Sequence, residues 1–146
     1  NMEQTMHKVL FICGRNSGRS QIAHAFLDRL GLGRYQVKSA GLEPADSVNP
    51  LVIEVMKEEG VDLSETRPRA AFDLVKKGEV FSYVITVCDK ETDDNCPVFP
   101  GIQRRENWPF PDPEKLSGSH GEKLDQVRKI RDDIKSRLIE YFSLSA

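Results

Sequence analysis

Near the start of the chain runs the stretch Val9-Leu10-Phe11-Ile12-Cys13-Gly14-Arg15-Asn16-Ser17-Gly18-Arg19-Ser20-Gln21. Its first four residues are apolar, as expected of a buried strand, and they end at a cysteine. Five residues then separate Cys13 from Arg19, and a helical pattern follows. A strand, a short loop and a helix in this order are typical of α/β proteins, and they place the loop at the carboxyl end of the strand.

The loop after Cys13 has the composition of an anion-binding loop. Small and polar residues let successive backbone N–H groups turn inward, and the helix that follows adds its free N–H groups and its positive dipole end. The guanidinium of Arg19 matches two oxygens of a tetrahedral anion better than a lysine would. We therefore predict an oxyanion-binding loop, formed by Gly14, Arg15, Asn16, Ser17, Gly18, Arg19 and Ser20.

Cys13 lies at the floor of this predicted loop. A positive environment favours the thiolate, which is the nucleophilic form of cysteine. The alternative is a buried structural cysteine beside a solvated arginine, since cysteine is among the most buried residue types. The preceding strand, the small residues and the following helix together favour a nucleophile.

Bulk properties limit the possible classes. A chain of 146 residues is the length of one ordinary domain, so we expect a single domain over residues 1–146. A net charge of −2 gives no reason to expect nucleic acid or a membrane surface as a partner. The polar segment from Asn1 to His7 predicts no signal peptide. Three cysteines are too few for a secreted disulfide scaffold, which favours a cytoplasmic protein with catalytic or redox-active cysteines.

Strand-like and helix-like segments alternate along the chain. This alternation predicts an α/β fold with a four-stranded parallel sheet and helices on both faces. Strands are expected at 8–12, 35–39, 81–87 and 102–107, and helices at 17–30, 50–60, 70–77 and 120–142. Cys13 follows the first expected strand and Cys88 follows the third, so both should lie at the carboxyl edge of the sheet.

On these motifs the chain resembles the low-molecular-weight protein tyrosine phosphatase superfamily. The Cys-x5-Arg-Ser loop carries the resemblance, which continues at Ser39-Ala40-Gly41, Val48-Asn49-Pro50, Val87-Cys88 and Trp108-x-Phe-x-Asp112-Pro113. Its arsenate reductase branch is the closer match, because Gln21 stands where the phosphatases usually carry proline. The resemblance implies a low-molecular-weight phosphatase-like fold, arsenate as substrate, and no cofactor.

Two further cysteines flank a polar segment. Between Cys88 and Cys96 lie four acids and no apolar residue, which predicts a mobile loop that could bring the two sulfurs together. From the residues alone, Cys88 could be a core residue and Cys96 an unrelated surface thiol, whereas a zinc site lacks ligands. The resemblance assigns redox roles: Cys13 attacks arsenate, Cys88 attacks Cys13, and Cys96 resolves that bond. It also implies thioredoxin or another thiol reductant as partner.

Asp112 lies in Pro109-Phe110-Pro111-Asp112-Pro113, where the prolines stiffen the backbone and disfavour a helix. Taken alone, this is a common turn aspartate. The resemblance makes Asp112 the general acid that protonates the leaving oxygen while Cys13 attacks.

Several positions depart from the family pattern. Arg15 replaces a glycine, Gly18 replaces a cysteine, and the segment between Cys88 and Cys96 is one residue longer than usual. Some relatives bind potassium through asparagine, serine and acidic side chains. Asn16 and Ser39 match, but His24 and Arg69 stand where acids are needed, so we expect no metal. A plain hydrogen-bonded role is the interpretation we favour for His24.

Two other functions remain open at this point. A phosphatase needs only Cys13, Arg19 and an Asp-Pro acid, although Glu114 and Lys115 stand where phosphatases usually carry aromatic residues. Such an enzyme has no use for Cys88 together with Cys96. A non-catalytic redox sensor that keeps the fold is the third possibility.

Overall fold

The computed structural model describes residues 7–145. Four parallel strands form its sheet, β1 (His7–Cys13), β2 (Tyr35–Gly41), β3 (Tyr83–Thr86) and β4 (Arg104–Asn107), in the order β2-β1-β3-β4. The first strand therefore lies inside the sheet, paired on both sides, as its nearly continuous apolar sequence predicts. The predicted fold class, a four-stranded parallel sheet with helices on both faces, is confirmed.

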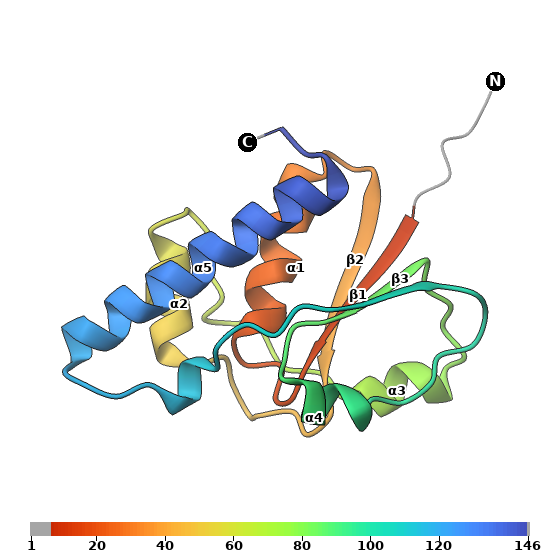
Figure 1. The fold of residues 1–146 in the computed structure, drawn as a ribbon, viewed down its shortest axis with the longest axis horizontal. Helices are drawn as coiled ribbons and strands as arrows, with labels where there is room; N and C mark the ends of the chain where they lie inside the picture. Colours follow the sequence, from red (N-terminus) through yellow and green to blue (C-terminus); the bar gives the residue numbers. More distant parts are fainter. Residues whose placement is uncertain (1–6, 146) are drawn as a thin grey trace.

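The helices form two layers around this sheet (Figure 1). One face carries α1 (Arg19–Leu30), α2 (Pro50–Lys57) and α5 (His120–Phe142), and the other carries α3 (Ala71–Lys76). Side chains alternate along β1, so Val9 and Phe11 pack in the larger core while Leu10 and Ile12 pack in the smaller one.

Local sequence signals explain where helices α2 and α5 begin. The Asn49 side chain accepts a hydrogen bond from the backbone N–H of Leu51, and Pro50 occupies the first position of α2. Ser119 and Glu122 form a reciprocal capping box at the start of α5. The predicted bounds of α5, 120–142, agree with the structure.

Other predicted bounds shift. The strand expected at 81–87 is confined to β3, and Ile102, expected to begin the last strand, is almost fully exposed. Ser17 and Gly18 stay in the loop before α1. The prediction of a polar loop after Cys88 is wrong. The segment forms α4 (Lys90–Asp94), because Asp89 caps its first turn.

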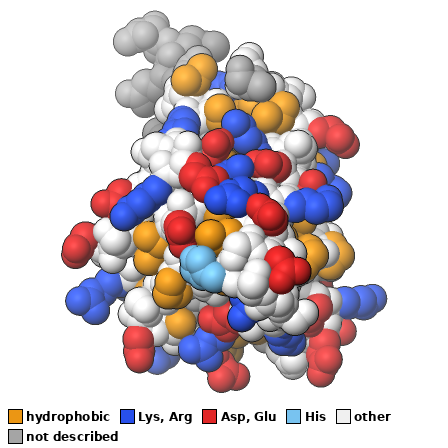
Figure 2. Space-filling view, turned by 90° about the vertical axis from the view of Figure 1, so that its left-hand side faces the viewer, with side chains coloured by type: hydrophobic (Ala, Val, Ile, Leu, Met, Phe, Trp, Pro, Cys, Tyr) orange, Lys and Arg blue, Asp and Glu red, His pale blue; other side chains and the backbone are white. Residues whose placement is uncertain are grey.

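The carboxyl ends of the strands, α4 and the loop before α1 gather at one end of the molecule, the lower end in Figure 1. On the side of α2 and α5, acidic and basic side chains are interspersed with apolar ones (Figure 2). No helix within residues 7–145 has the length and apolar character needed to cross a membrane. Most of the polar N-terminal segment, for which no signal peptide is predicted, lies outside these described residues.

Candidate active site

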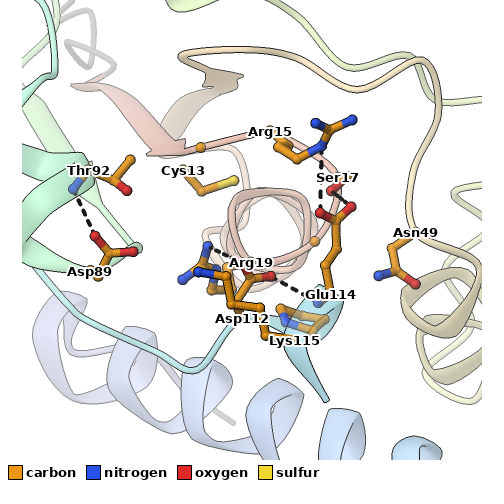
Figure 3. A pocket seen from close by; sticks show the side chains of 13 residues that line it. Cys13, Arg15, Ser17, Arg19, Asn49, Asp89, Thr92, Asp112, Glu114 and Lys115 are labelled. Carbon is orange, nitrogen blue, oxygen red and sulfur yellow. Dashed lines mark hydrogen bonds and ion pairs between the residues drawn. The ribbon is translucent and has the colours of Figure 1, made fainter. Parts of the chain in front are cut away.

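A cavity of about 90 Å³ lies at the carboxyl edge of the sheet, beside Cys13 (Figure 3). A water molecule occupies roughly 30 Å³ in the liquid, so the cavity has room for a small anion rather than for a drug-sized molecule. Of the predicted site residues, it brings together Cys13, Gly14, Arg15, Ser17, Gly18, Arg19 and Asp112.

The loop from Gly14 to Gly18 directs its carbonyl groups away from this cavity. The carbonyl oxygens of Gly14, Arg15 and Ser17 accept hydrogen bonds from the backbone of the 43–49 segment. Within residues 7–145, the N–H groups of Ser17 and Gly18 donate to no protein acceptor. This orientation leaves backbone donors that could serve an anion in the cavity.

Gly41 at the end of β2 allows this arrangement. A β-carbon at that position would lie 2.7 Å from the backbone nitrogen of Asn16 and 2.8 Å from the carbonyl carbon of Arg15. Only glycine tolerates so close an approach, which gives a physical reason for the Ser39-Ala40-Gly41 motif.

The sulfur of Cys13 is held by two groups beneath the cavity. It lies 2.9 Å from the hydroxyl oxygen of Ser20, and it accepts a hydrogen bond from the backbone N–H of Asn16 at 3.2 Å. The Asn16 side-chain amide donates to the Ser20 hydroxyl at 2.7 Å. Because that bond occupies the oxygen of Ser20 as an acceptor, the hydroxyl is free to donate to the sulfur.

Asn16 and Ser20 are predicted as oxyanion-binding residues, but the structure places their side chains beneath the cavity instead. Both side chains are buried and neither lines the cavity. The side chain of Asn16 accepts hydrogen bonds from Gln21 and from the backbone of Arg69, which fixes its orientation. Its backbone has a φ of 53°, a conformation that asparagine adopts more readily than most residues.

Arg19 connects the loop to the segment that carries Asp112. Its guanidinium donates to the carbonyl oxygen of Phe110 at 2.9 Å and lies 3.7 Å from the carboxylate of Asp112. Asp112 caps a single 3₁₀ turn, η1 (Pro113–Lys115), by accepting from the backbone N–H of Glu114. Cys13, Arg19 and Asp112 thus face the same space (Figure 3).

Cys88 follows β3, the neighbour of β1, and is almost fully buried. Burial raises the pKa of its thiol to about 12, and the charge of the Cys13 thiolate adds to this shift. Cys13 and Cys88 both belong to the larger core. The side chain of Asn107 donates to the carbonyl of Cys88 and fixes its backbone.

Cys96 lies on the opposite side of the sheet. It packs against the smaller core, the one that α3 covers, and it is only partly buried. Burial raises the pKa of its thiol, and the neighbouring Arg105 opposes that shift. All three cysteines are free thiols in this structure.

Helix α4, between Cys88 and Cys96, is tied to the sheet by one side chain. Asp93 accepts a hydrogen bond from the hydroxyl of Thr86 at 2.6 Å and pairs with Arg105 at 3.2 Å. This contact could not be predicted from sequence, because the segment contains no apolar residue and its partners lie in β3 and β4.

Other residues that line the cavity were not predicted as site residues. They are Asn49, Asp89, Thr92, Pro113, Glu114 and Lys115. Their position at the cavity depends on the fold; Asn49 is predicted from sequence only as the cap of the helix that begins at Pro50, and Asp89 carries a similar cap signal.

The two residues matched to a potassium site have protein partners. The hydroxyl of Ser39 lies 2.9 Å from Nδ1 of His24, as expected of a hydrogen-bonded histidine. Burial lowers the pKa of His24, although nearby Asp28 opposes the shift. The side-chain oxygen of Asn16 is engaged by Gln21 and Arg69.

Comparison with known proteins places this site in a family. The family model described as low molecular weight phosphotyrosine protein phosphatase matches residues 8–145. Curated arsenate reductases are also similar: that of Bacillus subtilis is 34% identical over 91% of this chain and 93% of its own length. That of Halalkalibacterium halodurans is 37% identical over 89% of this chain and 91% of its own. The chain belongs to the arsenate reductases of the low-molecular-weight phosphatase family.

Solved structures of this family have the same fold. An arsenate reductase in the oxidized state superposes with a TM-score of 0.77 at 32% identity, covering 92% of this chain and 95% of that one. A thioredoxin-dependent arsenate reductase of Corynebacterium glutamicum matches 97% of this chain with a TM-score of 0.73 and 32% sequence identity. This chain spans 63% of the length of that protein. A tyrosine phosphatase of Erwinia amylovora shares the fold, with a TM-score of 0.74. It is 19% identical over 97% of this chain and 95% of its own.

Proposed function

We propose that the chain reduces arsenate to arsenite through the three thiols, with Cys13 as the first nucleophile. The observation that carries this proposal is the position of Cys13 at a small cavity at the end of β1, beside β3, the strand that Cys88 follows. The small number of cysteines fits a cytoplasmic enzyme with redox-active thiols rather than a secreted disulfide scaffold.

In the first step, the Cys13 thiolate attacks the arsenic of bound arsenate. A sulfur–arsenic bond forms, and one oxygen leaves as water after protonation by Asp112. Arg19 and the loop N–H groups bind the remaining oxygens and balance their charge. The Asn16 and Ser20 contacts hold the sulfur beneath the anion.

In the second step, Cys88 attacks the sulfur of Cys13. A Cys13–Cys88 disulfide forms, the sulfur–arsenic bond breaks, and its electron pair leaves with arsenic as arsenite. The Cys88 thiol loses its proton to solvent before it attacks, and the departing arsenite takes up a proton from water. Burial is the main reason why the pKa of Cys88 is raised, so deprotonation of this thiol limits the second step.

In the third step, Cys96 attacks the sulfur of Cys88. This reaction frees the Cys13 thiolate and leaves a Cys88–Cys96 disulfide for an external dithiol. Because Cys88 and Cys96 pack against different cores, α4 must leave its position for their sulfurs to meet. Thioredoxin is the proposed reductant, since one structural relative is described as thioredoxin-dependent.

A phosphatase side activity is also expected. Cys13, Arg19 and Asp112 meet the needs of phosphate ester hydrolysis, and phosphate is nearly isosteric with arsenate. This activity needs neither Cys88 nor Cys96.

A coupled assay tests the proposal. NADPH oxidation is followed with thioredoxin and thioredoxin reductase, with and without arsenate, and aryl phosphate hydrolysis is measured on the same samples. Cys13→Ser should abolish both activities, whereas Cys88→Ser and Cys96→Ser should abolish reduction only. Wild-type rates of reduction in both of the last two variants would disprove the thiol cascade.

A further inference from the structure

Three polar side chains that contact one another line one side of the Cys13 cavity. Glu114 follows Asp112-Pro113, and its carboxylate reaches the anion-binding loop at two points. One oxygen accepts a hydrogen bond from the hydroxyl of Ser17 at 3.1 Å, and the other lies 3.5 Å from Nε of Arg15. We call Arg15, Ser17 and Glu114 the clasp.

The clasp connects segments that are far apart in the sequence. Ser17 lies between Cys13 and α1, whereas Glu114 lies in η1, the turn that Asp112 caps. Figure 3 shows the Glu114 side chain extending along the cavity to meet Ser17 and Arg15, on the side opposite Thr92 and Asp89. It therefore closes that side of the cavity.

The charge on Glu114 distinguishes the clasp from the anion-binding groups. A carboxylate beside an anion site repels the anion unless a cation compensates, and Arg15 supplies that cation. The Arg15 guanidinium is thus engaged with the protein, while the backbone of its loop remains available to the anion.

From this geometry we infer that the clasp is a specificity device, which admits free tetrahedral oxyanions and disfavours their organic esters. An ester bound with its anion on Arg19 must direct its organic group away from Cys13, toward Asp112 and the clasp. Free arsenate or phosphate has only a hydroxyl there. The inference rests on the proposed role of this cavity as an oxyanion site.

Protection of Cys13 from alkylation measures this selectivity without turnover. Iodoacetamide alkylates Cys13, and mass spectrometry of the Cys13 peptide measures the rate. The decrease of this rate with increasing inorganic phosphate or phenylphosphonate gives an apparent dissociation constant for each anion. The ratio of the phenylphosphonate constant to the phosphate constant is the selectivity. Glu114→Ala should lower this ratio at least fivefold, chiefly because phenylphosphonate binds more tightly to the variant. Ser17→Ala, which removes one contact of the clasp, should lower it less.

Glu43→Ala is the matched control, since Glu43 is an exposed carboxylate beside the same loop that takes no part in the clasp. Its ratio should equal that of the wild type. A ratio within twofold of wild type in both clasp variants, or an equal fall in Glu43→Ala, would overturn the inference. If phosphate protects Cys13 but arsenate is not reduced, the proposed function fails and the clasp is still judged by the ratio. If neither anion protects Cys13 in the wild type, the inference is overturned.

Discussion

The hydroxyl oxygen of Ser20 lies 2.9 Å from the sulfur of Cys13, and both groups are buried beneath the anion cavity. The contact joins the last residue of β1 to the first turn of α1. With the Asn16 amide donating to its oxygen, the Ser20 hydroxyl can donate to the sulfur. The nucleophile is thus oriented by the same helix start that supplies positive charge to the site.

Replacing Ser20 by alanine should slow Cys13. A hydrogen bond to a charged group contributes about 1.5–3 kcal/mol, which corresponds to about tenfold or more in rate. We expect Ser20→Ala to lower the alkylation rate of Cys13 and kcat/KM for arsenate by at least this factor. Both are measured at neutral pH on protein whose circular dichroism matches the wild type. An unchanged alkylation rate would show that the hydroxyl does not support the thiolate.

Arsenite release should accelerate as pH rises. The pKa of Cys88 is raised to about 12, chiefly by burial, so its thiol is almost entirely protonated at neutral pH. Because the thiolate is the attacking form, the rate of the second step should rise by up to tenfold per pH unit below this pKa. Single-turnover release of arsenite from about pH 7 to pH 9 measures this dependence. Cys96→Ser should keep the same slope, and a flat profile in both proteins would exclude Cys88 as the attacking thiol.

Loosening α4 should speed formation of the Cys88–Cys96 disulfide. Asp93 ties α4 to Thr86 and Arg105, so Asp93→Ala removes a charged hydrogen bond. We expect hydrogen exchange in residues 90–94 to rise about tenfold and the disulfide to form faster under mild oxidation. Asp94→Ala, at an exposed neighbour on the same helix, is the control and should leave both unchanged. Slower oxidation in Asp93→Ala would indicate that the docked helix promotes the reaction.

The ion cluster between α2 and α5 should make stability depend on acid pH. Hydrogen bonds from Arg128 and Arg131 lower the pKa of Glu58 to about 2. Since this folded-state pKa is depressed, the contribution is complete above the ordinary value of 4.5 and is lost as pH falls toward about 2. Glu58→Gln should therefore lower Tm at pH 6, and its difference from wild type should shrink in acid. The control Glu65→Gln, at an exposed carboxylate, should have the same Tm as the wild type at each pH. A Tm difference between Glu58→Gln and wild type that does not change with pH would contradict the pairing of Glu58 with the two arginines.

Elements with their own periodic pattern and caps could be predicted from sequence. The buried β1, the capped α2 and the long amphipathic α5 all carry local signals, and the structure reproduces them. Helix α4 could not be predicted in this way, because its residues are all polar. Its stability depends on the Asp89 cap and on the contacts that Asp93 makes with two strands.

In the site, too, only the features that depend on local sequence could be predicted. The Cys-x5-Arg spacing predicts that Cys13 and Arg19 share one loop, and the structure places both at the cavity. The burial of Ser20 beneath the sulfur depends on how α1 packs, and the contact between Ser17 and Glu114 joins residues 97 positions apart. Such contacts depend on tertiary structure, so the local sequence carries no signal for them.

The most direct test of the thiol cascade is one turnover of reduced wild-type protein with an excess of arsenate and no external reductant. We predict about one arsenite per protein molecule and, by peptide mass spectrometry, a disulfide between Cys88 and Cys96 with Cys13 free. Arsenite formed in that amount with Cys88 and Cys96 still reduced, or no arsenite at all, would contradict the account.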